Sequence, residues 1–431
     1  MNTAEIKIWG QLVGAVSWDD YMETGIFEFE PSFIKNEWDL APLIMPLDAI
    51  KRGEREFEFM GLNKDTFYGL PGLLSDALPD KYGTTLMDAW LASQGRAAGS
   101  MNPVERLCYI GKRGMGALEF EPIQHATAET AERINIDQLV RVAEEILGKR
   151  TDFTTSIQDD VKKGLEDIIR VGTSAGGARA KAIIAYNEKN GEVRSGQVTA
   201  PKGFEHWLIK FDGVDSSELK DPKGYGRIEY AYYKMIVDCG IEMSESKLLE
   251  ENGRAHFMTK RFDRIAGKEK LHVQSLCAMS HFDFSKVGAY AYEQVFQTIR
   301  SLRLSASASQ QLYKRMVFNV VARNLDDHTK NFSFIMDKTG TWNLAPAFDV
   351  TWSYNPSNKW IQRHNLSMNG KTDNITRDDL LKVGKEMGVK KTKAIIDEVI
   401  SVVKKWPSYA EETGVKSAQL EHIGSTHLTH L

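Results

Sequence analysis

Apolar and polar residues alternate in short stretches near the start of the chain. Ile6 and Ile8 follow this period of two, and so do Phe27 and Phe29 on either side of a glutamate. Successive side chains of a β-strand point to opposite faces, so the pattern predicts short strands with one buried face. Glycines between the stretches favour tight turns and hence antiparallel pairing. We expect this β-rich N-terminal subdomain to end near residue 122.

The middle of the chain predicts a second, small sheet. Residues 182–211 read as two strands around an Asn190-Gly191 turn, followed by a loop and a third strand. Asn-Gly suits the positive backbone angles of a tight hairpin, which supports the turn. A helix is expected over about 226–239, where apolar residues recur at helical spacing and a glycine follows. These elements predict a mixed lobe over residues 123–265.

Beyond about residue 270 the apolar positions recur every three or four residues. The pattern is clear in the segments YEQVFQTIRSL, QQLYKRMVFNVVARNL and KAIIDEVISVVKKW. It predicts an all-helical lobe over residues 266–431. We expect the tail HIGSTHLTHL to be a frayed end, since nothing near its histidines supplies the carboxylate or cysteine partners of a metal site.

Composition restricts the possible classes of protein. A chain of 431 residues predicts two or three folding units, and 42% hydrophobic with 26% charged residues is typical of a globular protein rather than a disordered one. The formal charge of −4 means that any contact with nucleic acid must come from a local patch. Three scattered cysteines argue against a disulfide framework, and no long apolar run suggests a membrane span. We therefore expect a cytoplasmic protein that does not contact a membrane.

The stretch NLDDHTKNF at 324–332, followed by APAFDV at 345–350, carries the strongest chemical signal. Asp326 and Asn331 are five residues apart and Asp349 follows, a spacing that protein kinases use for a catalytic base and metal ligands. Phosphoryl transfer needs a carboxylate that accepts the proton of the incoming hydroxyl. Asp326 is the candidate for this role, and Asp327 is its rival.

The other polar residues of this stretch have predicted roles as well. Mg²⁺ prefers oxygen ligands and keeps waters and nucleotide phosphates, so Asn331 and Asp349 could suffice as protein ligands. His328 could hold the loop by hydrogen bonds, and Lys330 could neutralise charge on the transferring group. The alternative is a polar loop that caps the preceding apolar helix, with Asp326 or Asp327 as a cap or turn residue.

Two further features could bind phosphate. Residues 172–181 read GTSAGGARAK, and small residues there would let backbone N–H groups approach phosphate oxygens. Glycine-rich loops without a ligand are equally compatible with this sequence. Lys210 lies in the apolar segment HWLIKF, where an ammonium group needs an anionic partner, such as a nucleotide phosphate together with Glu229. The alternative is that Lys210 points into solvent on an edge strand.

Taken together, these motifs resemble the HipA family, the serine/threonine-kinase toxins of bacterial type II toxin-antitoxin systems. The resemblance rests on FYGLPGLLSDALPDKYG, SAGGARAK, HWLIKF, KRFDR, NLDDHTKNFSF and LAPAFDV, in this order over most of the chain. It implies an α+β, two-lobed, protein-kinase-like fold. The expected parts are the β-rich N-terminal subdomain, a small mixed ATP-binding lobe, and a helical C-terminal lobe with the magnesium and base residues.

The resemblance also implies roles for individual residues. Asp326 resembles the family's catalytic base, and Asn331 and Asp349 match its magnesium ligands. Ser174 falls where the family autophosphorylates, in a loop that binds nucleotide phosphates and is ejected after phosphorylation, which inactivates the kinase. The residues expected to bind ATP are Ser174, Ala175, Gly176, Gly177, Ala178, Arg179, Lys181, Lys210 and Glu229, with Lys260, Arg261 and Phe262 as the adenine hinge and Phe348 near the ring.

The sequence departs from the family pattern at two places. Lys260 stands at a hinge position where a well-known member has Glu, so adenine recognition would rely on backbone groups. Arg179 and Ala180 replace a Gln-Glu pair in the loop motif, which changes the contacts of the docked loop.

For function, the resemblance implies a kinase that uses ATP and Mg²⁺ to modify a translation factor, in characterised members an aminoacyl-tRNA synthetase such as glutamyl-tRNA synthetase. This modification inhibits growth and promotes persistence. The implied partner is a HipB-like helix-turn-helix antitoxin dimer, which carries most of the contact with operator DNA. The alternative is a weakly catalytic or non-catalytic corepressor, for which a basic helical region could touch phosphates: Lys390, Lys391, Lys393, Lys404 and Lys405. A kinase for a small molecule is a third possibility.

Overall fold

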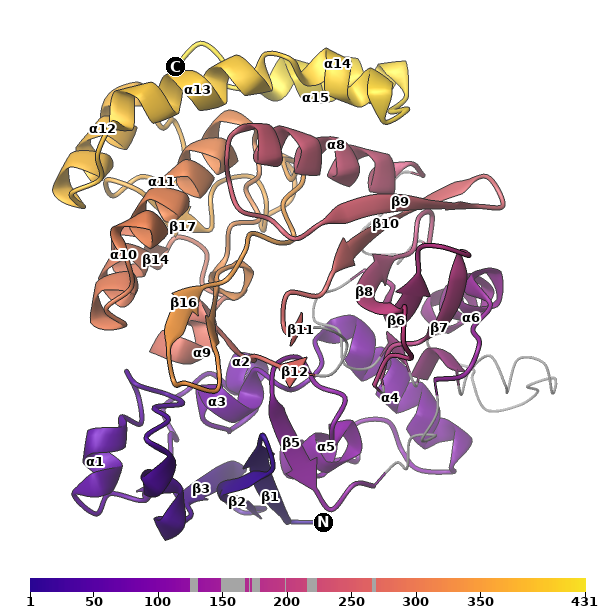
Figure 1. Cartoon of the computed structure of the whole chain (residues 1–431), viewed down its shortest axis with the longest axis vertical. Helices are drawn as coiled ribbons and strands as arrows, with labels where there is room; N and C mark the ends of the chain where they lie inside the picture. The colour runs from indigo at the N-terminus through magenta and orange to yellow at the C-terminus, as the bar shows by residue number, and fades with distance from the viewer. Residues whose placement is uncertain are drawn as a thin grey trace. The chain divides into compact units, whose positions relative to one another are not determined.

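The computed structural model divides the chain into two compact units. It describes residues 1–124, 131–148, 167–169, 171–172, 179–197, 199–214, 223–265 and 269–431. The first unit comprises Met1–Tyr225, Lys247–Val273 and Met336–Gly340, and the second comprises Gly226–Ser246, Gln274–Ile335 and Thr341–Leu431. The chain therefore passes between the units several times (Figure 1). The boundaries predicted at 122 and 265 remain predictions.

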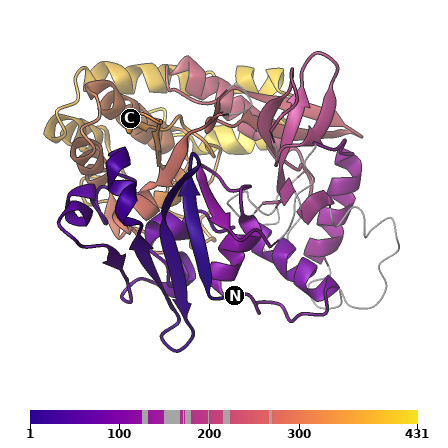
Figure 2. The same cartoon turned by 60° about the horizontal axis from the view of Figure 1, so that its bottom comes forward.

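The first unit begins with an antiparallel sheet, as the alternating pattern predicts. Its strands are ordered β4-β3-β2-β1-β5 and have the bounds Glu56–Phe57, Thr24–Phe29, Gln11–Asp19, Thr3–Ile8 and Leu118–Glu121. The indigo strands lie side by side in Figure 2. Ile6, Ile8, Phe27 and Phe29 are all buried, so one face of the sheet forms a core. Gly14 is required in β2, because a Cβ there would lie 2.0 Å from the Glu28 carbonyl oxygen.

Short helices accompany this sheet. They are η1 (Pro31–Asn36), α1 (Leu47–Lys51), α2 (Lys64–Phe67), α3 (Gly72–Ser75), α4 (Lys81–Ser93) and α5 (Pro103–Ile110). Helix α5 begins at residues that favour a helix N-terminus. Asn102 caps the helix by accepting a hydrogen bond from the Glu105 N–H, and Pro103 occupies the first turn.

A second sheet of the first unit confirms the small sheet predicted in the middle of the chain. Its strands are ordered β7-β6-β8-β10-β9 and have the bounds Glu192–Ser195, Lys181–Asn187, Glu205–Lys210, Arg254–Lys260 and Ser246–Glu251. The predicted Asn190-Gly191 turn is present: Gly191 has φ +70° and its N–H donates to the Asn187 carbonyl oxygen at 2.9 Å. A short hairpin, β11 (Arg264–Ile265) and β12 (Glu269–Lys270), follows.

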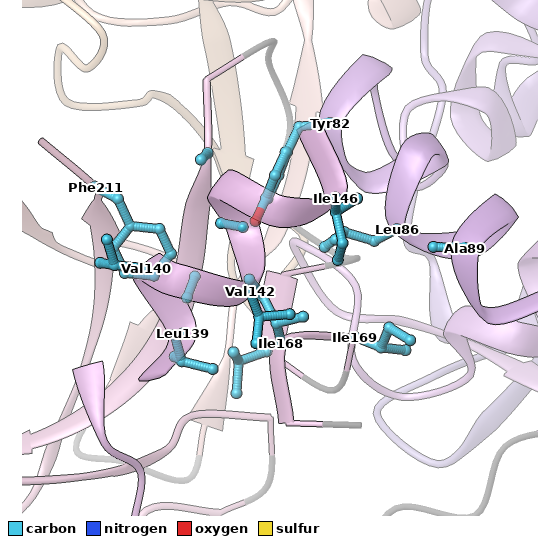
Figure 3. Packing of buried hydrophobic residues seen from close by; sticks show 14 of the residues in the cluster. Tyr82, Leu86, Ala89, Leu139, Val140, Val142, Ile146, Ile168, Ile169 and Phe211 are labelled. Atoms are coloured by element: carbon cyan, nitrogen blue, oxygen red, sulfur yellow. The ribbon is translucent and has the colours of Figure 1, made fainter. Parts of the chain in front are cut away.

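Helix α6 (Ile136–Gly148) contributes an apolar face to the core beside this sheet. Leu139, Val140 and Ile146 from α6 join Leu86 of α4 and Phe211, which follows β8, in one buried cluster (Figure 3). Deleting a buried leucine or isoleucine side chain from such a cluster costs about 2–5 kcal/mol of stability. The cluster therefore fixes the base of the strands that carry Lys181 and Lys210.

The second unit is mainly helical. Its helices are α8 (Tyr225–Asp238), α9 (Leu276–Ser280), α10 (Tyr292–Ser301), α11 (Ala306–Val321), α12 (Arg377–Glu386), α13 (Thr392–Val403), α14 (Trp406–Glu412) and α15 (Ser417–Thr426). The part of the chain that the structure describes contains no helix long and apolar enough to cross a membrane.

The C-terminal lobe is not all-helical, which corrects the prediction. Strands β13 (His272–Ser275), β15 (Ser333–Met336) and β16 (Trp342–Leu344) form a three-stranded sheet, and β14 (Tyr290–Ala291) pairs in parallel with β17 (Leu366–Ser367). Each strand has only two to four residues, too few for a period of two to be visible in the sequence.

The predicted frayed end at the C-terminus is also wrong. Helix α15 runs to Thr426, and the ring of His427 then lies 5.5 Å from the ring of Trp406 and 6.2 Å from that of Tyr232. The Tyr232 hydroxyl lies 3.0 Å from His427 Nε2, and the Leu428 N–H donates to the Val321 carbonyl oxygen at 2.9 Å. Burial lowers the pKa of His427 to about 4, so the ring is neutral at pH 7. Only residues far away in the sequence make this histidine a core residue.

Candidate active site

The two loops that carry the predicted catalytic residues lie side by side in the second unit. On one side, Asn324 and Ser353 form a parallel bridge. The Leu325 N–H donates to the Ser353 carbonyl oxygen, and the Ser353 N–H donates to the Arg323 carbonyl oxygen, both at 3.1 Å. On the other side, β15 and β16 belong to one sheet, and the Ala345 N–H donates to the Ser333 carbonyl oxygen at 2.9 Å. Residues 326–331 and 346–352 are therefore held between two backbone links. This arrangement brings the Asp326 and Asn331 loop next to that of Asp349.

Asp327 organises the loop from inside the protein. Its side chain is fully buried, and its Oδ2 accepts hydrogen bonds from the Tyr292 hydroxyl and from His364 Nδ1, both at 2.8 Å. Its Oδ1 accepts from the Asn365 N–H at 2.7 Å. Burial, followed by the charge of Asp327, raises the pKa of Tyr292 well above its usual value, so the tyrosine remains a donor. A carboxylate enclosed in this way cannot reach a substrate hydroxyl.

Asp326 has the opposite environment. Its side chain is 42% exposed, and its Oδ1 lies 3.8 Å from His328 Nε2. Its backbone carbonyl oxygen accepts a hydrogen bond from Asn331 Nδ2 at 2.6 Å, which joins the two ends of the motif. Of the two adjacent aspartates, only Asp326 is placed to meet a molecule that arrives from solvent.

The residues predicted to hold magnesium carry oxygen atoms of the kind that this ion prefers. Because Asn331 uses its amide nitrogen on Asp326, its amide oxygen, the atom that would bind the ion, faces the other way. Asp349 has φ +53°, a left-handed conformation that costs about 1 kcal/mol or more for a non-glycine residue and must be held by its surroundings. Nearby, the Ala347 N–H donates to the Glu242 carbonyl oxygen at 2.7 Å, which fixes the segment before Asp349.

No group of three or more His, Cys, Asp or Glu side chains among the described residues could hold a metal alone. One carboxylate and one amide oxygen suit Mg²⁺, which takes its remaining ligands from water and nucleotide phosphates.

His328 and Lys330 share an aromatic neighbour. The His328 ring lies 5.6 Å from the Phe284 ring, and Lys330 Nζ lies 4.6 Å from the centre of the same ring. His328 Nδ1 is buried without a hydrogen bond in the described structure, and the distance from Nε2 to Asp326 is too long for one. The hydrogen bonds that hold this loop are therefore made by Asp327 rather than by His328.

In the first unit, Lys181 and Lys210 form a buried pair of like charges. They are directly opposite each other in the antiparallel pairing of β6 with β8, so their side chains leave the same face of the sheet. Lys181 is 3% and Lys210 is 8% exposed. Strand β8 is the central strand of its sheet, so the alternative of a solvent-facing lysine on an edge strand is wrong. Both lysine side chains therefore lie on one buried face of this sheet.

The other predicted ATP-binding residues are less fully described. Ser174, Ala175, Gly176, Gly177 and Ala178 lie outside the described residues. The Arg179 guanidinium stacks 3.6 Å from the centre of the Tyr225 ring. Glu229 is buried on α8, in the second unit, so its predicted pairing with Lys210 remains a prediction. Phe348 immediately precedes Asp349 and is half-buried.

The predicted hinge is a fixed end of β10. Lys260 Nζ pairs with Glu205 Oε1 at 2.5 Å, and the Arg261 N–H donates to the His206 carbonyl oxygen at 2.9 Å. The Arg261 side chain is directed into the protein, where its Nε donates to Asp263 Oδ1 at 2.8 Å. It therefore supports the backbone rather than presenting its charge to a ligand.

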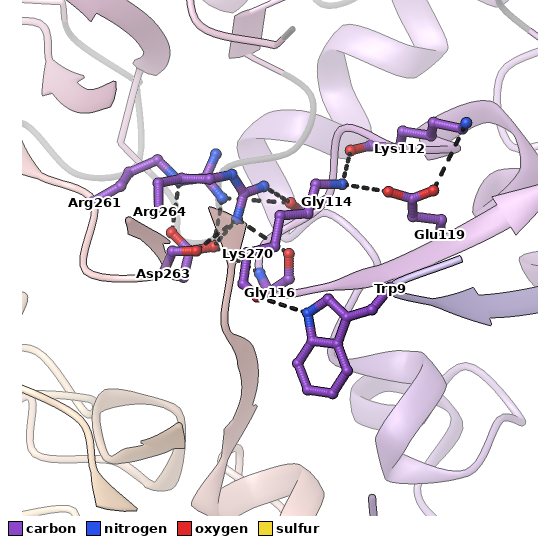
Figure 4. A network of polar contacts seen from close by, with 9 residues as sticks. All are labelled: Trp9, Lys112, Gly114, Gly116, Glu119, Arg261, Asp263, Arg264 and Lys270. Atoms are coloured by element: carbon purple, nitrogen blue, oxygen red, sulfur yellow. Dashed lines mark hydrogen bonds and ion pairs between the residues drawn. The ribbon is translucent and has the colours of Figure 1, made fainter. Parts of the chain in front are cut away.

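Asp263 is the centre of a buried polar network that the sequence reasoning missed. Its Oδ2 accepts from Arg261 and Arg264 at 2.6 Å each and from the Gly116 N–H at 2.7 Å (Figure 4). Burial alone would raise the pKa of Asp263, but the two guanidinium groups outweigh it and hold this pKa well below its usual range. In the same network, Lys270 Nζ pairs with Glu119 at 2.9 Å. The signal for Asp263 was the KRFDR segment, in which a carboxylate stands between two arginines.

Comparison with protein families agrees with this architecture. Residues 4–121 match the HipA N-terminal domain, and residues 173–406 match the HipA-like C-terminal domain. The second match alone covers more than half of the chain. The protein belongs to the HipA family.

Individual relatives are more distant. The serine/threonine-protein kinase toxin HipA of Shewanella oneidensis is 22% identical over 368 residues, which cover 81% of this chain and 74% of the relative. Relatives named as kinases in Haemophilus influenzae and Sinorhizobium fredii are 29% and 25% identical over 134 and 128 residues, or 28% and 27% of this chain. The chain matches only 39% and 30% of the length of these two relatives.

A solved structure has the same fold. The Shewanella oneidensis HipA in a complex with HipB and operator DNA aligns with a TM-score of 0.66 at 18% identity, over 98% of this chain and 95% of that one. This match confirms the predicted α+β, HipA-like fold.

Proposed function

We propose that this protein is a serine/threonine protein kinase toxin that transfers the γ-phosphate of ATP to a protein hydroxyl. The observation that carries the proposal is the pairing of the two loops, with Asp327 buried and Asp326 exposed beside Asn331 and Asp349. The names of the relatives support the same activity. A capping loop, the alternative reading, gives no reason for a strained Asp349 or for a second buried aspartate.

In the proposed mechanism the second unit supplies the base. The exposed Asp326 carboxylate orients the acceptor hydroxyl and takes its proton during transfer. Asn331 and Asp349 would hold Mg²⁺, which when bound would supply positive charge for the phosphates. Lys330, held over Phe284, adds positive charge near the transferring group.

The first unit supplies phosphate binding in this proposal. Lys181 and Lys210 present two ammonium groups on one face of the sheet, which suits the negative charge of a nucleotide polyphosphate. The neighbouring glycine-rich loop would add backbone N–H groups. We infer that adenine binds backbone groups at Lys260 and Phe262, since the side chains of Lys260 and Arg261 are already paired.

Regulation and partners follow the family resemblance. We infer autophosphorylation at Ser174, which would add about −1.5 to −2 charges beside the nucleotide phosphates and drive the loop out. We propose an aminoacyl-tRNA synthetase as the acceptor, and a HipB-like antitoxin as the partner that brings the protein to operator DNA. The complex of HipA, HipB and operator DNA formed by the structural relative supports the second assignment.

A corepressor without catalysis is the second candidate, favoured by the same complex. The basic helical region around α13 is exposed at each of its lysines: Lys390, Lys391, Lys393, Lys404 and Lys405. Salt-sensitive operator binding that depends on these lysines, without turnover of ATP, would favour this candidate.

Kinase activity is tested with the full chain, first treated with a phosphatase and then incubated with labelled ATP and Mg²⁺. Label should appear on Ser174, and phosphoproteomics after brief expression should reveal acceptor serines that are absent with Asp326→Asn. The variant must match the wild type in thermal midpoint, since it removes a base and no packing. Absence of label on the protein and on added synthetases would refute the proposed kinase.

A further inference from the structure

The last turn of α11 leads directly into the loop of the proposed base Asp326. Carbonyl groups at this end of a helix have no partner within the helix, so the partners that they find fix where the loop starts. The Asn324 N–H donates to the Asn319 carbonyl oxygen at 2.9 Å, and Arg323 has φ +59°, the left-handed conformation that ends many helices. This turn leaves the carbonyl groups of residues 321–323 to partners outside the helix.

Three distant segments supply these partners. The donors are the Leu428 N–H, the Tyr232 hydroxyl and the Ser353 N–H, which reach the carbonyl oxygens of Val321, Ala322 and Arg323 at 2.9, 2.6 and 3.1 Å. They belong to the residues after α15, to α8 and to the loop of Asp349. His427 supports the second donor, since its Nε2 lies 3.0 Å from the Tyr232 hydroxyl. Residues 427 and 428 therefore contribute to two of the three links at the start of the Asp326 loop.

The neighbouring Thr426 reaches the second catalytic loop. Trp352 follows Asp349 in that loop, and its Nε1–H donates to Thr426 Oγ1 at 3.0 Å. The Thr426 hydroxyl donates its own proton to the Ile423 carbonyl oxygen at 2.7 Å, which leaves its oxygen to accept from Trp352. We call residues 426–428 the C-terminal brace, because they contact one catalytic loop and the helix end from which the other loop starts.

The brace lies outside the parts of the chain to which a role has been assigned. The match to the HipA-like C-terminal domain ends at residue 406, and the catalytic motifs end at Val350. A single neutral hydrogen bond contributes little to net stability. By contrast, displacement of a reacting group by about 1 Å lowers a rate up to about a hundredfold. Loss of the bond between Trp352 and Thr426 should therefore affect transfer more than folding.

We propose that the C-terminal brace sets the positions of the two catalytic loops relative to each other, and that Thr426 and Trp352 are positioning residues for phosphoryl transfer. The brace acts through Asp326 and Asp349, and so it changes kcat more than the binding of ATP. This inference rests on the proposed kinase activity and adds the residues that position its base.

The test measures label transfer from ATP, with Mg²⁺, to the phosphatase-treated full chain at increasing ATP concentrations. Thr426→Val keeps the shape and loses the accepting oxygen, so it should lower the maximal rate about tenfold and change KM for ATP less than about threefold. Thr426→Ser keeps the hydroxyl and should restore the rate, whereas a packing role would require the methyl group and give the reverse order. Trp352→Phe/Thr426→Val should lose no more than either single variant, since both remove the same bond.

Hydrogen exchange supplies a readout that does not depend on turnover. The amides of Leu325 and Ser353 join the two loops, and in Thr426→Val they should exchange several times faster while the urea midpoint of the second unit stays close to that of the wild type. The matched control is Ser425→Ala, which removes an exposed hydroxyl that donates to the His422 carbonyl oxygen at 2.7 Å. It should change neither the rate nor the exchange.

An unchanged rate in Thr426→Val, or a loss of rate that Thr426→Ser shares, would overturn the brace while leaving the kinase intact. Unchanged exchange of the two amides would also overturn it, because the loops would then keep their positions without the bond. Absence of label on the wild type would overturn the kinase, and with it the role of the brace in transfer.

Discussion

The two adjacent aspartates of the catalytic loop should respond to substitution in opposite ways. Asp327→Ala removes a buried carboxylate and leaves three donors, on Tyr292, His364 and Asn365, without their acceptor. An unsatisfied buried polar group costs about 1–3 kcal/mol, and this substitution leaves three of them. We expect Asp327→Ala to lower the free energy of unfolding of the second unit by about 3–5 kcal/mol, a large share of the 5–15 kcal/mol typical of a domain.

Two further variants separate charge from geometry. Asp327→Asn keeps the shape and one acceptor oxygen, so its loss should be smaller, about 1–3 kcal/mol. Asp326→Asn changes a side chain that is 42% exposed, and its stability should stay within about 0.5 kcal/mol of the wild type. Its rate of transfer should fall at least about a hundredfold, since a general base contributes about 10²–10⁴.

The assay combines urea unfolding, followed by tryptophan fluorescence, with transfer of label from ATP. Because the chain has two compact units, the transitions are fitted separately rather than as one two-state process. A normal unfolding midpoint for Asp327→Ala together with full activity of Asp326→Asn would refute our assignment and make Asp327 the base.

Three further outcomes follow from buried groups. Asp263→Asn leaves two arginines beside a neutral amide, so the free energy of unfolding of the first unit, measured in urea, should decrease by about 3–5 kcal/mol. An unchanged unfolding midpoint would mean that water replaces the carboxylate. His427→Ala removes a ring that packs on Trp406, so it should lower the thermal midpoint of the second unit and cost about 2–3 kcal/mol of stability. If a chain truncated after residue 426 were as stable as the full chain, the tail would not be docked. Burial lowers the pKa of both His256 and His272 to about 4, so between pH 6.5 and 4 the unfolded chain binds protons that the folded chain does not. The free energy of unfolding of the first unit should therefore decrease as the pH is lowered through this window, by roughly 1 kcal/mol per histidine at pH 5.5. A free energy of unfolding that does not change with pH in urea titrations would exclude the effect.

The sequence predicts well what depends on local pattern. The strands around Ile6 and Phe27 alternate over enough residues to show a period of two, and the Asn190-Gly191 hairpin depends on two adjacent residues. In both cases the determinant lies within about six residues. The burial of Lys210 did not follow in this way, because its neighbours left two alternatives open, and the central position of β8 in its sheet decides between them.

The sequence could not predict what depends on distant partners. Asp327 is fixed by Tyr292 and Asn365, which are 35 and 38 residues away, and His427 meets Tyr232 from 195 residues away. Nothing in the letters around these residues distinguishes a core carboxylate from an exposed one, or a docked tail from a frayed one. The short strands β15 and β16 were missed for a related reason, since they exist through pairing and not through a pattern of their own.

The difference between Asp326 and Asp327 shows how the buried polar residues serve the site. A base must reach solvent and substrate, yet its position has to be fixed to a fraction of an ångström for efficient transfer. The 42% exposed side chain of Asp326 does not supply that rigidity alone. Asp327 supplies it instead: it ties the loop to α10 through Tyr292 and to His364, 37 residues further along the chain. Asn365, whose N–H donates to the same carboxylate, also donates from its side chain to the Leu325 carbonyl oxygen, so the backbone immediately before the base is fixed through one buried carboxylate.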